Sequence, residues 1–340
     1  MKRFSKLFWT AAGIALFAIM DANPSLFFYD AIFVKPQRQH IMRNRFQGKR
    51  IWITGASSGI GEALAEELYS YGAHVITSAR RVDRLRDLAE RCANNNESNP
   101  DAGSIRILPF DALSSSKKYD SVVRKAVGFY GGIDILILNA GQSQTMLALE
   151  TPEESTRKLM DLNFMSPVRL ALAVIKIDEW ESKKSGHIIL TSSVGGKLAI
   201  PLSSSYAASK HALNGFFGTL RAENSSWMRV DIICPGPVAT LIDKAAIAIM
   251  ENTRRDNFDT KMSVARCAQL MLSSIAGPQG LFYETWMAKQ PVLTYSLLNQ
   301  YIPNIYIVLI NFYGTLRKAA YYQGEDLFKI SSLVKAGFAK

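Results

Sequence analysis

A short apolar run followed at once by a glycine-rich turn is the feature that most constrains the fold of this chain. Residues 51–53 (Ile-Trp-Ile) have the composition of a buried strand, and residues 62–71 have helical periodicity. The turn between them, residues 54–61, reads Thr-Gly-Ala-Ser-Ser-Gly-Ile-Gly. Such a turn lets the backbone approach a pyrophosphate, which then lies at the positive N-terminus of the helix.

The spacing G-x-x-x-G-x-G between a strand and a helix therefore predicts a dinucleotide site. A tight turn without a ligand is the alternative. The residues expected to contact the dinucleotide are Gly55, Ser57, Ser58, Gly59, Ile60 and Gly61.

Strand-like and helix-like segments alternate along the rest of the chain. Further strands are expected at residues 74–77, 104–109, 132–138, 186–192 and 229–234. This alternation predicts an α/β fold, a Rossmann-type doubly wound parallel sheet with helices on both faces. Ligands bind at the carboxyl edge of such a sheet. The residues expected at that edge are Asp111, Asn139, Ala140, Gly141, Ser193, Pro235, Gly236, Val238 and Thr240.

The end of the second strand indicates which dinucleotide binds. In this fold an acidic side chain there accepts a hydrogen bond from a ribose 2′-hydroxyl, whereas an arginine neutralises a 2′-phosphate. Arg80 and Arg81 follow the strand, and no Asp or Glu comes before Asp83. We therefore expect NADP(H) rather than NAD(H), with Arg80 as the main phosphate contact. A solvated surface arginine is the alternative for Arg80.

Tyr206 and Lys210 are the first candidates for chemistry. They are four residues apart on a helix expected over residues 206–228, so their side chains share one face. A nearby ammonium favours the phenolate, which would bring the pKa of Tyr206 into a working range. Ser193, at a strand end, is expected to hold a carbonyl or alcohol oxygen beside that phenol. Chance placement of Tyr and Lys at this spacing is the alternative.

Asn163 is a further candidate, on a helix expected to begin with Thr151 as N-cap and Pro152 as the first helical residue. An asparagine on a buried helix is usually a hydrogen-bonded structural group. The residue type alone therefore leaves a structural and a functional role open for Asn163.

Together these motifs resemble those of the classical short-chain dehydrogenases/reductases. From about residue 49 to residue 240 the glycine-rich turn and the candidate residues follow the family's order and spacing. The resemblance implies that Tyr206 is the general acid/base and that Ser193 polarises the substrate carbonyl. It also implies that Lys210 binds the nicotinamide ribose and lowers the pKa of Tyr206, and that Asn163 holds a water linking Lys210 to solvent. Leu138 departs from the pattern, because many members have a second asparagine there.

The chain termini carry a closer likeness. The N-terminal apolar segment, the turn at 235–238 and the tail residues 284–286, 290–291 and 300–303 resemble the membrane-bound member-7 branch of the family. That branch is usually called microsomal and is linked to steroid or retinoid carbonyls. The likeness implies an endoplasmic reticulum membrane and an apolar substrate, and the family often forms homodimers through the two long helices before and after Ser193.

The N-terminus predicts membrane attachment. Residues 7–20 carry no charge, three basic residues precede them, and a second apolar stretch follows at 26–34. We expect a retained signal-anchor rather than a cleaved signal peptide, because no small-x-small cleavage site follows the first stretch. Basic residues lie on both sides of the apolar region, so its orientation stays open. The glycosylation sequons at Asn96 and Asn224 would be used only in a lumen.

These features divide the chain into three parts. Residues 1–46 are expected to form the anchor and a basic linker, residues 47–280 the catalytic domain, and residues 281–340 a C-terminal extension. Within the domain, residues 241–262 are expected to form a lid over the substrate. The extension is rich in Tyr, Leu and Ile, which predicts either a helical cap over the cavity or a membrane-contacting surface.

Composition argues against several other classes of protein. The chain has 340 residues and a net charge of +11, but its Lys and Arg are scattered, so no nucleic-acid partner is expected. The 3 Cys and 4 His are dispersed, which predicts neither a disulfide framework nor a metal site.

The sequence therefore predicts an NADP(H)-dependent carbonyl reductase or alcohol dehydrogenase that acts by hydride transfer on an apolar substrate, a steroid-, retinoid- or lipid-like carbonyl. One alternative is a non-catalytic, membrane-anchored scaffold that binds nucleotide or lipid. The other is an NAD-linked retinol or steroid oxidase.

Overall fold

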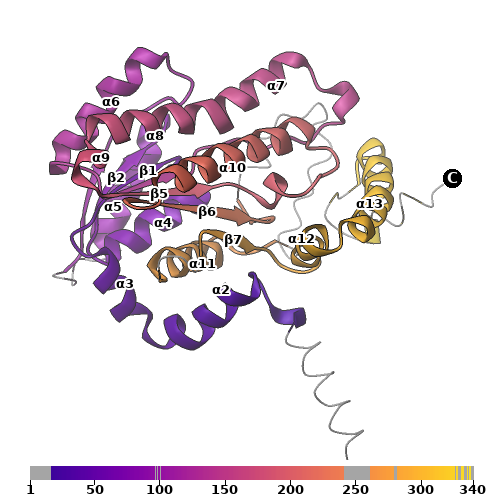
Figure 1. Ribbon diagram of the computed structural model, residues 1–340, viewed down its shortest axis with the longest axis horizontal. Coiled ribbons are helices and arrows are strands. Elements are labelled where there is room, and N and C mark those ends of the chain that lie inside the picture. Colours follow the sequence, from indigo (N-terminus) through magenta and orange to yellow (C-terminus); the bar gives the residue numbers. More distant parts are fainter. Residues whose placement is uncertain are drawn as a thin grey trace, which may run out of the picture.

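The computed structural model describes residues 17–95, 97, 99, 101–240, 261–278 and 282–325, with a few positions beyond them. A parallel sheet of seven strands in the order β3-β2-β1-β4-β5-β6-β7 forms its centre (Figure 1). Helices cover both faces of this sheet, so the α/β doubly wound fold is confirmed. The strands are β1 (Arg50–Thr54), β2 (His74–Ser78), β3 (Ser104–Ile107), β4 (Ile135–Leu138), β5 (Gly186–Thr191), β6 (Met228–Pro235) and β7 (Glu284–Met287).

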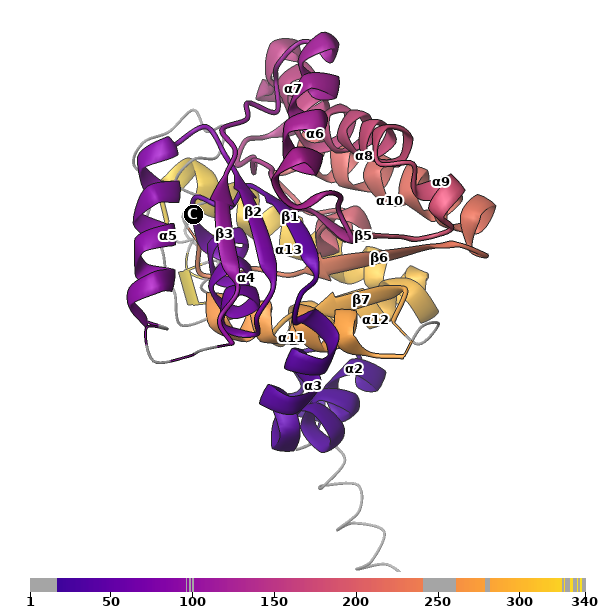
Figure 2. The same ribbon diagram turned by 90° about the vertical axis from the view of Figure 1, so that its left-hand side faces the viewer.

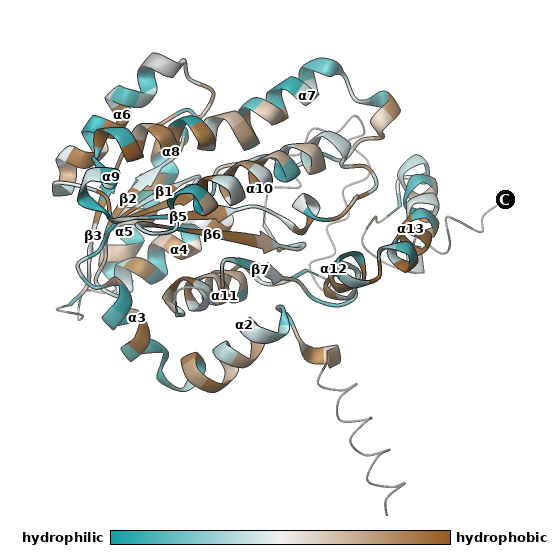
Figure 3. Cartoon of the chain, viewed as in Figure 1, coloured by the Kyte–Doolittle hydropathy of each residue, from teal (hydrophilic) through white to brown (hydrophobic). Residues whose placement is uncertain are grey.

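The strands are apolar on both sides because both faces of the sheet are covered. Successive side chains of a strand point to opposite faces, so Ile51 and Ile53 join one core while Trp52 joins the other. Trp52 pairs with Leu136 of β4, and both are fully buried. In Figure 3 the strands at the centre are largely brown, whereas α6 and α7 carry much teal.

Two layers of helices enclose the sheet (Figure 2). One face carries α6 (Ser116–Tyr130), α8 (Ser166–Ile177) and α10 (Ser204–Asn224). The other face carries α4 (Gly59–Ser70), α5 (Val82–Asn95) and α11 (Val264–Ala276). Shorter segments lead into the first layer, namely α7 (Glu153–Met160), the π-helical turn η4 (Asp161–Met165) and α9 (Trp180–Lys183).

Two helix bounds differ from those expected. The helix expected over 206–228 ends at Asn224, because Met228 is buried at the start of β6 and pairs with Gly186 of β5. Thr151 does not cap α7, since its hydroxyl donates to Leu147 O (2.8 Å) and accepts from a glutamine side chain. Pro152 takes the N-cap position instead.

The seventh strand, β7, was not expected from the sequence. It pairs in parallel with β6, with Ile232 beside Glu284 and Pro235 beside Met287. The sheet therefore extends past residue 280, where the sequence analysis ended the catalytic domain. A four-residue strand at the edge of a sheet has too short an apolar pattern to separate it from a loop.

The N-terminal segment packs against this sheet and its helices. It comprises α2 (Pro24–Tyr29), the turns η1 (Asp30–Val34) and η2 (Lys35–Gln37), and α3 (Arg38–Phe46), and it lies beside α11 (Figure 1). Leu26, Val34, Met42 and Phe46 are buried in the core of the domain. Residues 24–46, expected as apolar anchor and linker, are thus built into the fold, although Phe28, Ile32 and Phe33 remain exposed.

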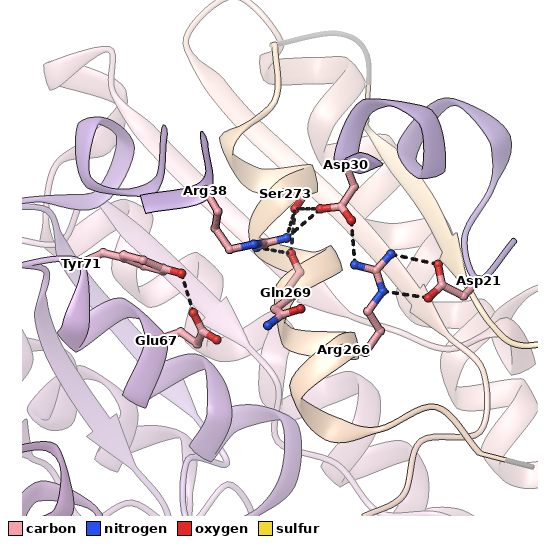
Figure 4. A network of polar contacts seen from close by, with 8 residues as sticks. All are labelled: Asp21, Asp30, Arg38, Glu67, Tyr71, Arg266, Gln269 and Ser273. Carbon is pink, nitrogen blue, oxygen red and sulfur yellow. Dashed lines mark hydrogen bonds and ion pairs between the residues drawn. The ribbon is translucent and has the colours of Figure 1, made fainter. Parts of the chain in front are cut away.

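A polar network fixes the N-terminal segment to α11 (Figure 4). Arg266 forms ion pairs with Asp21 (2.8 Å) and with Asp30 (2.6 Å). Asp30 is fully buried and also accepts hydrogen bonds from Arg38 (2.7 Å) and the hydroxyl of Ser273 (2.7 Å). A buried carboxylate needs such partners, because an unpaired buried charge is strongly destabilising.

The C-terminal helices lie at the carboxyl edge of the sheet, toward which the arrowhead of β6 points (Figure 1). They are α12 (Val292–Tyr301) and α13 (Pro303–Gln323), and Pro303 is the first residue of α13. Leu293 and Tyr306 pack there with Met20 and with Val194, the residue after Ser193. The tail therefore packs against the edge where the candidate residues are expected.

Some expectations fall on residues that the structure does not describe. The lid expected at 241–262 lies outside the described residues except for Lys261 and Met262, and Met262 forms a bridge with Val238. The sequon at Asn96 and most of the apolar run at 7–20 also lie outside them. Among the described helices, none has both the length and the hydropathy needed to cross a membrane.

Candidate active site

The glycine-rich turn joins β1 to α4 and packs closely against the end of β4. Gly55 has a φ of +69°, and a Cβ there would lie 2.9 Å from Ala140 Cα. A Cβ on Gly61 would lie 2.5 Å from Gly55 O. Only glycine fits these two positions, which explains the spacing seen in the sequence.

The start of α4 is available to an anion. The helix begins at Gly59, earlier than expected, and no side chain caps it at Ser58. The first backbone N–H groups of a helix lack intrahelical acceptors, and the helix dipole adds partial positive charge. The turn therefore suits the pyrophosphate of a dinucleotide. Ser57 is buried beside it, whereas Ile60 packs against the core.

Thr54 and Asn139 tie the ends of β1 and β4 together. Thr54 Oγ1 accepts the N–H groups of Asn139 (3.0 Å) and Ala140 (3.2 Å). Asn139 Nδ2 donates to Thr54 O (3.2 Å) and Gly55 O (3.4 Å). These bonds hold Asn139, Ala140 and Gly141 against the turn, as expected for a cofactor cradle. Thr54 was not singled out in the sequence, because a threonine at a strand end has no motif of its own.

The turn after β6 completes this edge. Gly236 donates its N–H to Met287 O (2.7 Å), and a Cβ on Gly236 would lie 2.6 Å from Ala288 Cβ. Thr240 reaches the glycine-rich turn, since its Cγ2 would lie 3.0 Å from a Cβ on Gly59. Pro235 and Val238 are buried between these two contacts. The predicted residues from β1, β4 and β6 therefore meet at one place.

Arg81 rather than Arg80 faces the glycine-rich turn. The Arg81 guanidinium donates to the hydroxyls of Ser57 (2.9 Å) and Ser58 (2.6 Å). Arg80 is exposed. Asp111, expected near the adenine, is also exposed, and its carboxylate accepts the N–H of Leu113 (3.1 Å) within a turn. The structure thus brings Arg81 to the glycine-rich turn, although both arginines are exposed.

Lys210 lies beneath the ring of Tyr206, as the four-residue spacing predicted. Lys210 Nζ is 5.8 Å from the centre of the Tyr206 ring and donates to Thr191 O (2.9 Å). Burial lowers the pKa of Lys210 to about 8, because the ammonium loses its hydration. The side chain is still mostly charged at pH 7. Tyr206 itself is half-buried.

Ser193 faces Tyr206 across Gly195. A Cβ on Gly195 would lie 3.2 Å from Tyr206 Cε1 and 3.4 Å from Ser193 Oγ. Ser193 Oγ accepts the N–H of Gly195 (3.0 Å) and donates to Pro235 O (3.4 Å). The long bond to Pro235 is weak, so the hydroxyl hydrogen can turn to a ligand oxygen.

Asn163 is brought to the same site from η4, and π-helical turns of this kind are frequent at functional sites. Its Oδ1 accepts the N–H of Gln142 (2.9 Å), and its Nδ2 donates to Gln142 O (3.0 Å) and Ser209 Oγ (3.1 Å). A Cβ on Gly141 would lie 3.2 Å from Asn163 Oδ1 and 3.7 Å from Lys210 Nζ. Asn163 and Lys210 therefore flank Gly141.

No metal centre accompanies this site in the described part of the chain. Those residues contain no group of three or more His, Cys, Asp or Glu that could hold a metal ion. Cys92, Cys234 and Cys267 are buried and are not joined in disulfide bonds. Burial raises the pKa of each of these thiols to about 12, so they remain protonated.

A nucleotide cradle beside a paired Tyr and Lys defines a dinucleotide-dependent oxidoreductase of Rossmann type. The sequence model of the family described as "short chain dehydrogenase" matches residues 49–249. The chain belongs to that family, close to its member-7 branch. It is therefore an oxidoreductase. Two solved structures with the same fold carry 5-hydroxy-NADP and NAD.

Curated relatives match most of the chain. Human dehydrogenase/reductase SDR family member 7 is 36% identical over 281 residues, covering 81% of this chain and 80% of the relative. The hydroxysteroid 11-beta-dehydrogenase 1-like protein of Gallus gallus is 33% identical over 295 residues, covering 86% and 92%. A short-chain dehydrogenase/reductase from Burkholderia phymatum, solved with NAD, has a TM-score of 0.64 at 22% identity and covers 77% of this chain and 96% of its own.

Proposed function

We propose that this protein interconverts a carbonyl and an alcohol on an apolar substrate, with NADP(H) as cofactor and Tyr206 as general acid/base. The observation that carries the proposal is the arrangement across Gly195, where the Ser193 hydroxyl faces the Tyr206 ring. The buried ammonium of Lys210 lies behind that ring. A substrate oxygen in this gap would contact a proton donor and a second hydroxyl at once.

Each residue then has a defined part in the reduction direction. Tyr206 gives its proton to the carbonyl oxygen as that oxygen gains charge. The Ser193 hydroxyl donates a hydrogen bond to the same oxygen, while the N–H of Gly195 holds Ser193 Oγ in place. The Lys210 ammonium stabilises the phenolate left on Tyr206. A bound nicotinamide supplies the hydride in this direction or accepts it in the reverse one.

Asn163 is proposed to hold a water through which Lys210 exchanges protons with solvent. Its position beside Gly141 and Lys210 supports this part. The direct contacts of its side chain are with Gln142 and Ser209. The same residue therefore also fixes residues 142–144, the strap that follows β4.

The choice of NADP(H) rests on the two arginines after β2. The Arg81 guanidinium on the hydroxyls of Ser57 and Ser58 is positively charged beside the cradle, and Arg80 is exposed next to it. A 2′-phosphate would gain two charge-assisted contacts there. Michaelis constants for NADPH and NADH test this choice. We expect a clear preference for NADPH, and equal use of both cofactors would favour the NAD-linked oxidase instead.

An apolar substrate and a membrane location form the last part of the proposal. The exposed side of α13 carries an apolar stripe, namely Ile305, Val308, Leu309 and Phe312, and the exposed N-cap Ile302 precedes it. Such a stripe suits contact with lipid, from which an apolar substrate could enter. Together with the apolar run at 7–20, it supports attachment to the endoplasmic reticulum membrane. Carbonate extraction tests attachment, and a glycosidase gel shift tests which side the domain faces.

A homodimer through α8 and α10 is proposed on the family resemblance, and Leu172 of α8 is 46% exposed on that surface. Size-exclusion chromatography with light scattering tests it.

The decisive experiment compares the wild-type protein with Tyr206→Phe in an NADPH-consumption screen against steroid, retinoid and aliphatic ketones and aldehydes. The substitution removes the hydroxyl that carries the transferable proton and keeps the ring, so we expect cofactor binding to persist while turnover falls by about 100-fold or more. Unchanged turnover would reject Tyr206 as the acid/base. Cofactor binding without turnover of any carbonyl in the wild type would favour the scaffold.

A further inference from the structure

Gln144 is a buried side chain that contacts the backbone of Tyr206. It lies in the strap that follows β4 and is only 1% exposed. Its Oε1 accepts the N–H of Ser205 (2.9 Å) and the N–H of Tyr206 (3.1 Å), 62 residues further along the chain. Its Nε2 donates to Thr151 Oγ1 (2.8 Å). Every polar atom of this side chain is therefore used to join three separate segments.

The start of α10 explains why such a contact is needed. The first N–H groups of a helix have no intrahelical acceptor, and a side chain at the N-cap usually accepts the second or third of them. Here the N-cap is Ser203, whose side chain makes no cap bond. Its hydroxyl donates to Gln144 O instead (3.1 Å). Gln144 thus supplies from another segment the cap that α10 lacks, and one of the two bonded N–H groups belongs to Tyr206.

The carbonyl side of Tyr206 is held from the same strap. Ser209 Oγ donates to Tyr206 O (2.7 Å) and accepts from Asn163 Nδ2 (3.1 Å). Asn163 in turn bonds both backbone polar groups of Gln142. Both peptide groups of Tyr206 are therefore tied to residues 142–144, which directly follow Gly141 of the cofactor cradle.

We propose that Gln144 is a positioning residue, which sets the place of Tyr206 relative to the cofactor cradle through the backbone N–H of Tyr206. The inference rests on the proposed function, in which Tyr206 is the acid/base. The described contacts of the Gln144 side chain are with two backbone N–H groups and the Thr151 hydroxyl, and none is with the Tyr206 hydroxyl. The effect of Gln144 is geometric, because a displacement of about 1 Å in a catalytic group can lower the rate by about 100-fold.

Two substitutions separate this role from simple stabilisation. Gln144→Met keeps the length of the side chain but removes its acceptor and donor. Gln144→Glu keeps an acceptor for the N–H groups of Ser205 and Tyr206, and its charge suits a helix N-terminus. We expect kcat on the best carbonyl of the screen to fall about 10- to 100-fold in Gln144→Met. NADPH affinity, measured by fluorescence titration, should stay near the wild-type value, and Gln144→Glu should regain most of the lost kcat.

Ser263→Ala is the matched control. Ser263 caps α11 on the opposite face of the sheet, where its Oγ accepts the N–H of Arg266 (3.2 Å). The control loses one helix cap, so its melting temperature should fall as in Gln144→Met while its kcat stays unchanged. If Gln144→Met does not fold, Gln144→Asn takes its place, because its amide is too short to reach the N–H of Tyr206.

The outcomes are distinguishable from failure of the proposed function. Loss of turnover in Tyr206→Phe, together with normal kcat in Gln144→Met, would overturn the positioning role alone. A Gln144→Glu variant as slow as Gln144→Met would overturn it too. Full turnover in Tyr206→Phe would overturn the proposed function itself.

Discussion

Where the strands begin, the carboxylates of Asp134 and Asp231 are paired with arginines, whereas at the carboxyl edge the buried Lys210 donates only to a backbone carbonyl among the contacts described. On the first side, Asp231 of β6 forms an ion pair with Arg229 (2.8 Å) and a hydrogen bond with the His187 ring (2.9 Å), and Arg50 pairs with Asp134 (2.6 Å). On the second side, Lys210 Nζ bonds Thr191 O. Paired charges stabilise the folded state, whereas a buried charge that is poorly compensated lowers the free energy of unfolding.

The comparison indicates that the two edges of one sheet differ in role. The edge where the strands begin contributes stability, and the carboxyl edge carries the candidate active site. Burial leaves the Lys210 ammonium able to act on Tyr206 and a ligand, because the described residues give it a carbonyl partner and no carboxylate. The same burial lowers its pKa, which is a direct sign of the cost. Such trade-offs between activity and stability are common at functional sites.

Replacing Lys210 gives the sharpest test of this comparison. Lys210→Met should lower kcat by about 100-fold or more, because Tyr206 loses its neighbouring cation. Burial lowers the Lys210 pKa from 10.5 to about 8, so at neutral pH the folded state holds a proton at a cost of about 3 kcal/mol. The variant should therefore unfold at higher urea concentration than the wild type.

Lys183→Met is the matched control for this prediction. Lys183 is half-exposed and pairs with the buried carboxylate of Asp178 (2.8 Å). Its removal should lower stability while kcat is unchanged. If both lysine variants lost stability alike, the proposed contrast between the two edges would be wrong.

Asp231→Asn tests the opposite edge. The residue is fully buried, and removing its charge leaves Arg229 without its anion. We expect a loss of about 3 kcal/mol in the free energy of unfolding. Turnover per folded molecule should not change, since Asp231 is remote from Tyr206. Asp83→Asn is the control, because Asp83 forms an exposed pair with Arg86, and it should alter neither stability nor turnover. A drop in kcat for Asp231→Asn would contradict the proposed difference between the two edges.

A smaller effect is expected from pH. Burial lowers the pKa of His187 from its usual 6.5, although Asp231 partly opposes the shift. The unfolded chain therefore binds a proton more readily than the folded one in this range. The contribution of His187 to the free energy of unfolding should be fully present above about pH 6.5 and should decrease as the pH falls below that value. Urea unfolding at pH 7.5 and pH 5.5 measures this, and the part due to His187 should disappear in His187→Gln.

Local motifs made much of this molecule predictable. Gly55, Gly59 and Gly61 lie within one short turn, and Tyr206 and Lys210 lie one helical turn apart. Both features are local in the sequence, so the sequence alone was enough to predict them. The structure places Ser193 and Asn163 beside them, although their roles remain predictions. Parallel strands converge at one edge, so the gathering of these residues followed once the alternation was recognised.

Non-local contacts were not predictable in the same way. Gln144 caps a helix 62 residues away, and no pattern in the sequence joins the two positions. The apolar stretch at 26–34 was assigned to the anchor, because hydropathy does not distinguish lipid from the side of a protein core. The contact of Arg81 with Ser57 and Ser58 was not predictable either, because packing sets the direction of a side chain after a strand. The role of Arg80 as the main phosphate contact stays a prediction.

The position of Asn23 has a consequence for any shortened version of the protein. Asn23 donates its N–H to Trp286 O (2.8 Å) and accepts the N–H of Trp286 on its side chain (3.2 Å), so it occupies hydrogen-bonding groups on the last strand of the sheet. Open strand borders recruit other chains into aggregates. A recombinant protein that starts after residue 46, designed to shed a membrane tether, would also uncover this border and is expected to precipitate. A recombinant protein that starts at residue 17 would keep Asn23 and its hydrogen bonds to Trp286 on this strand.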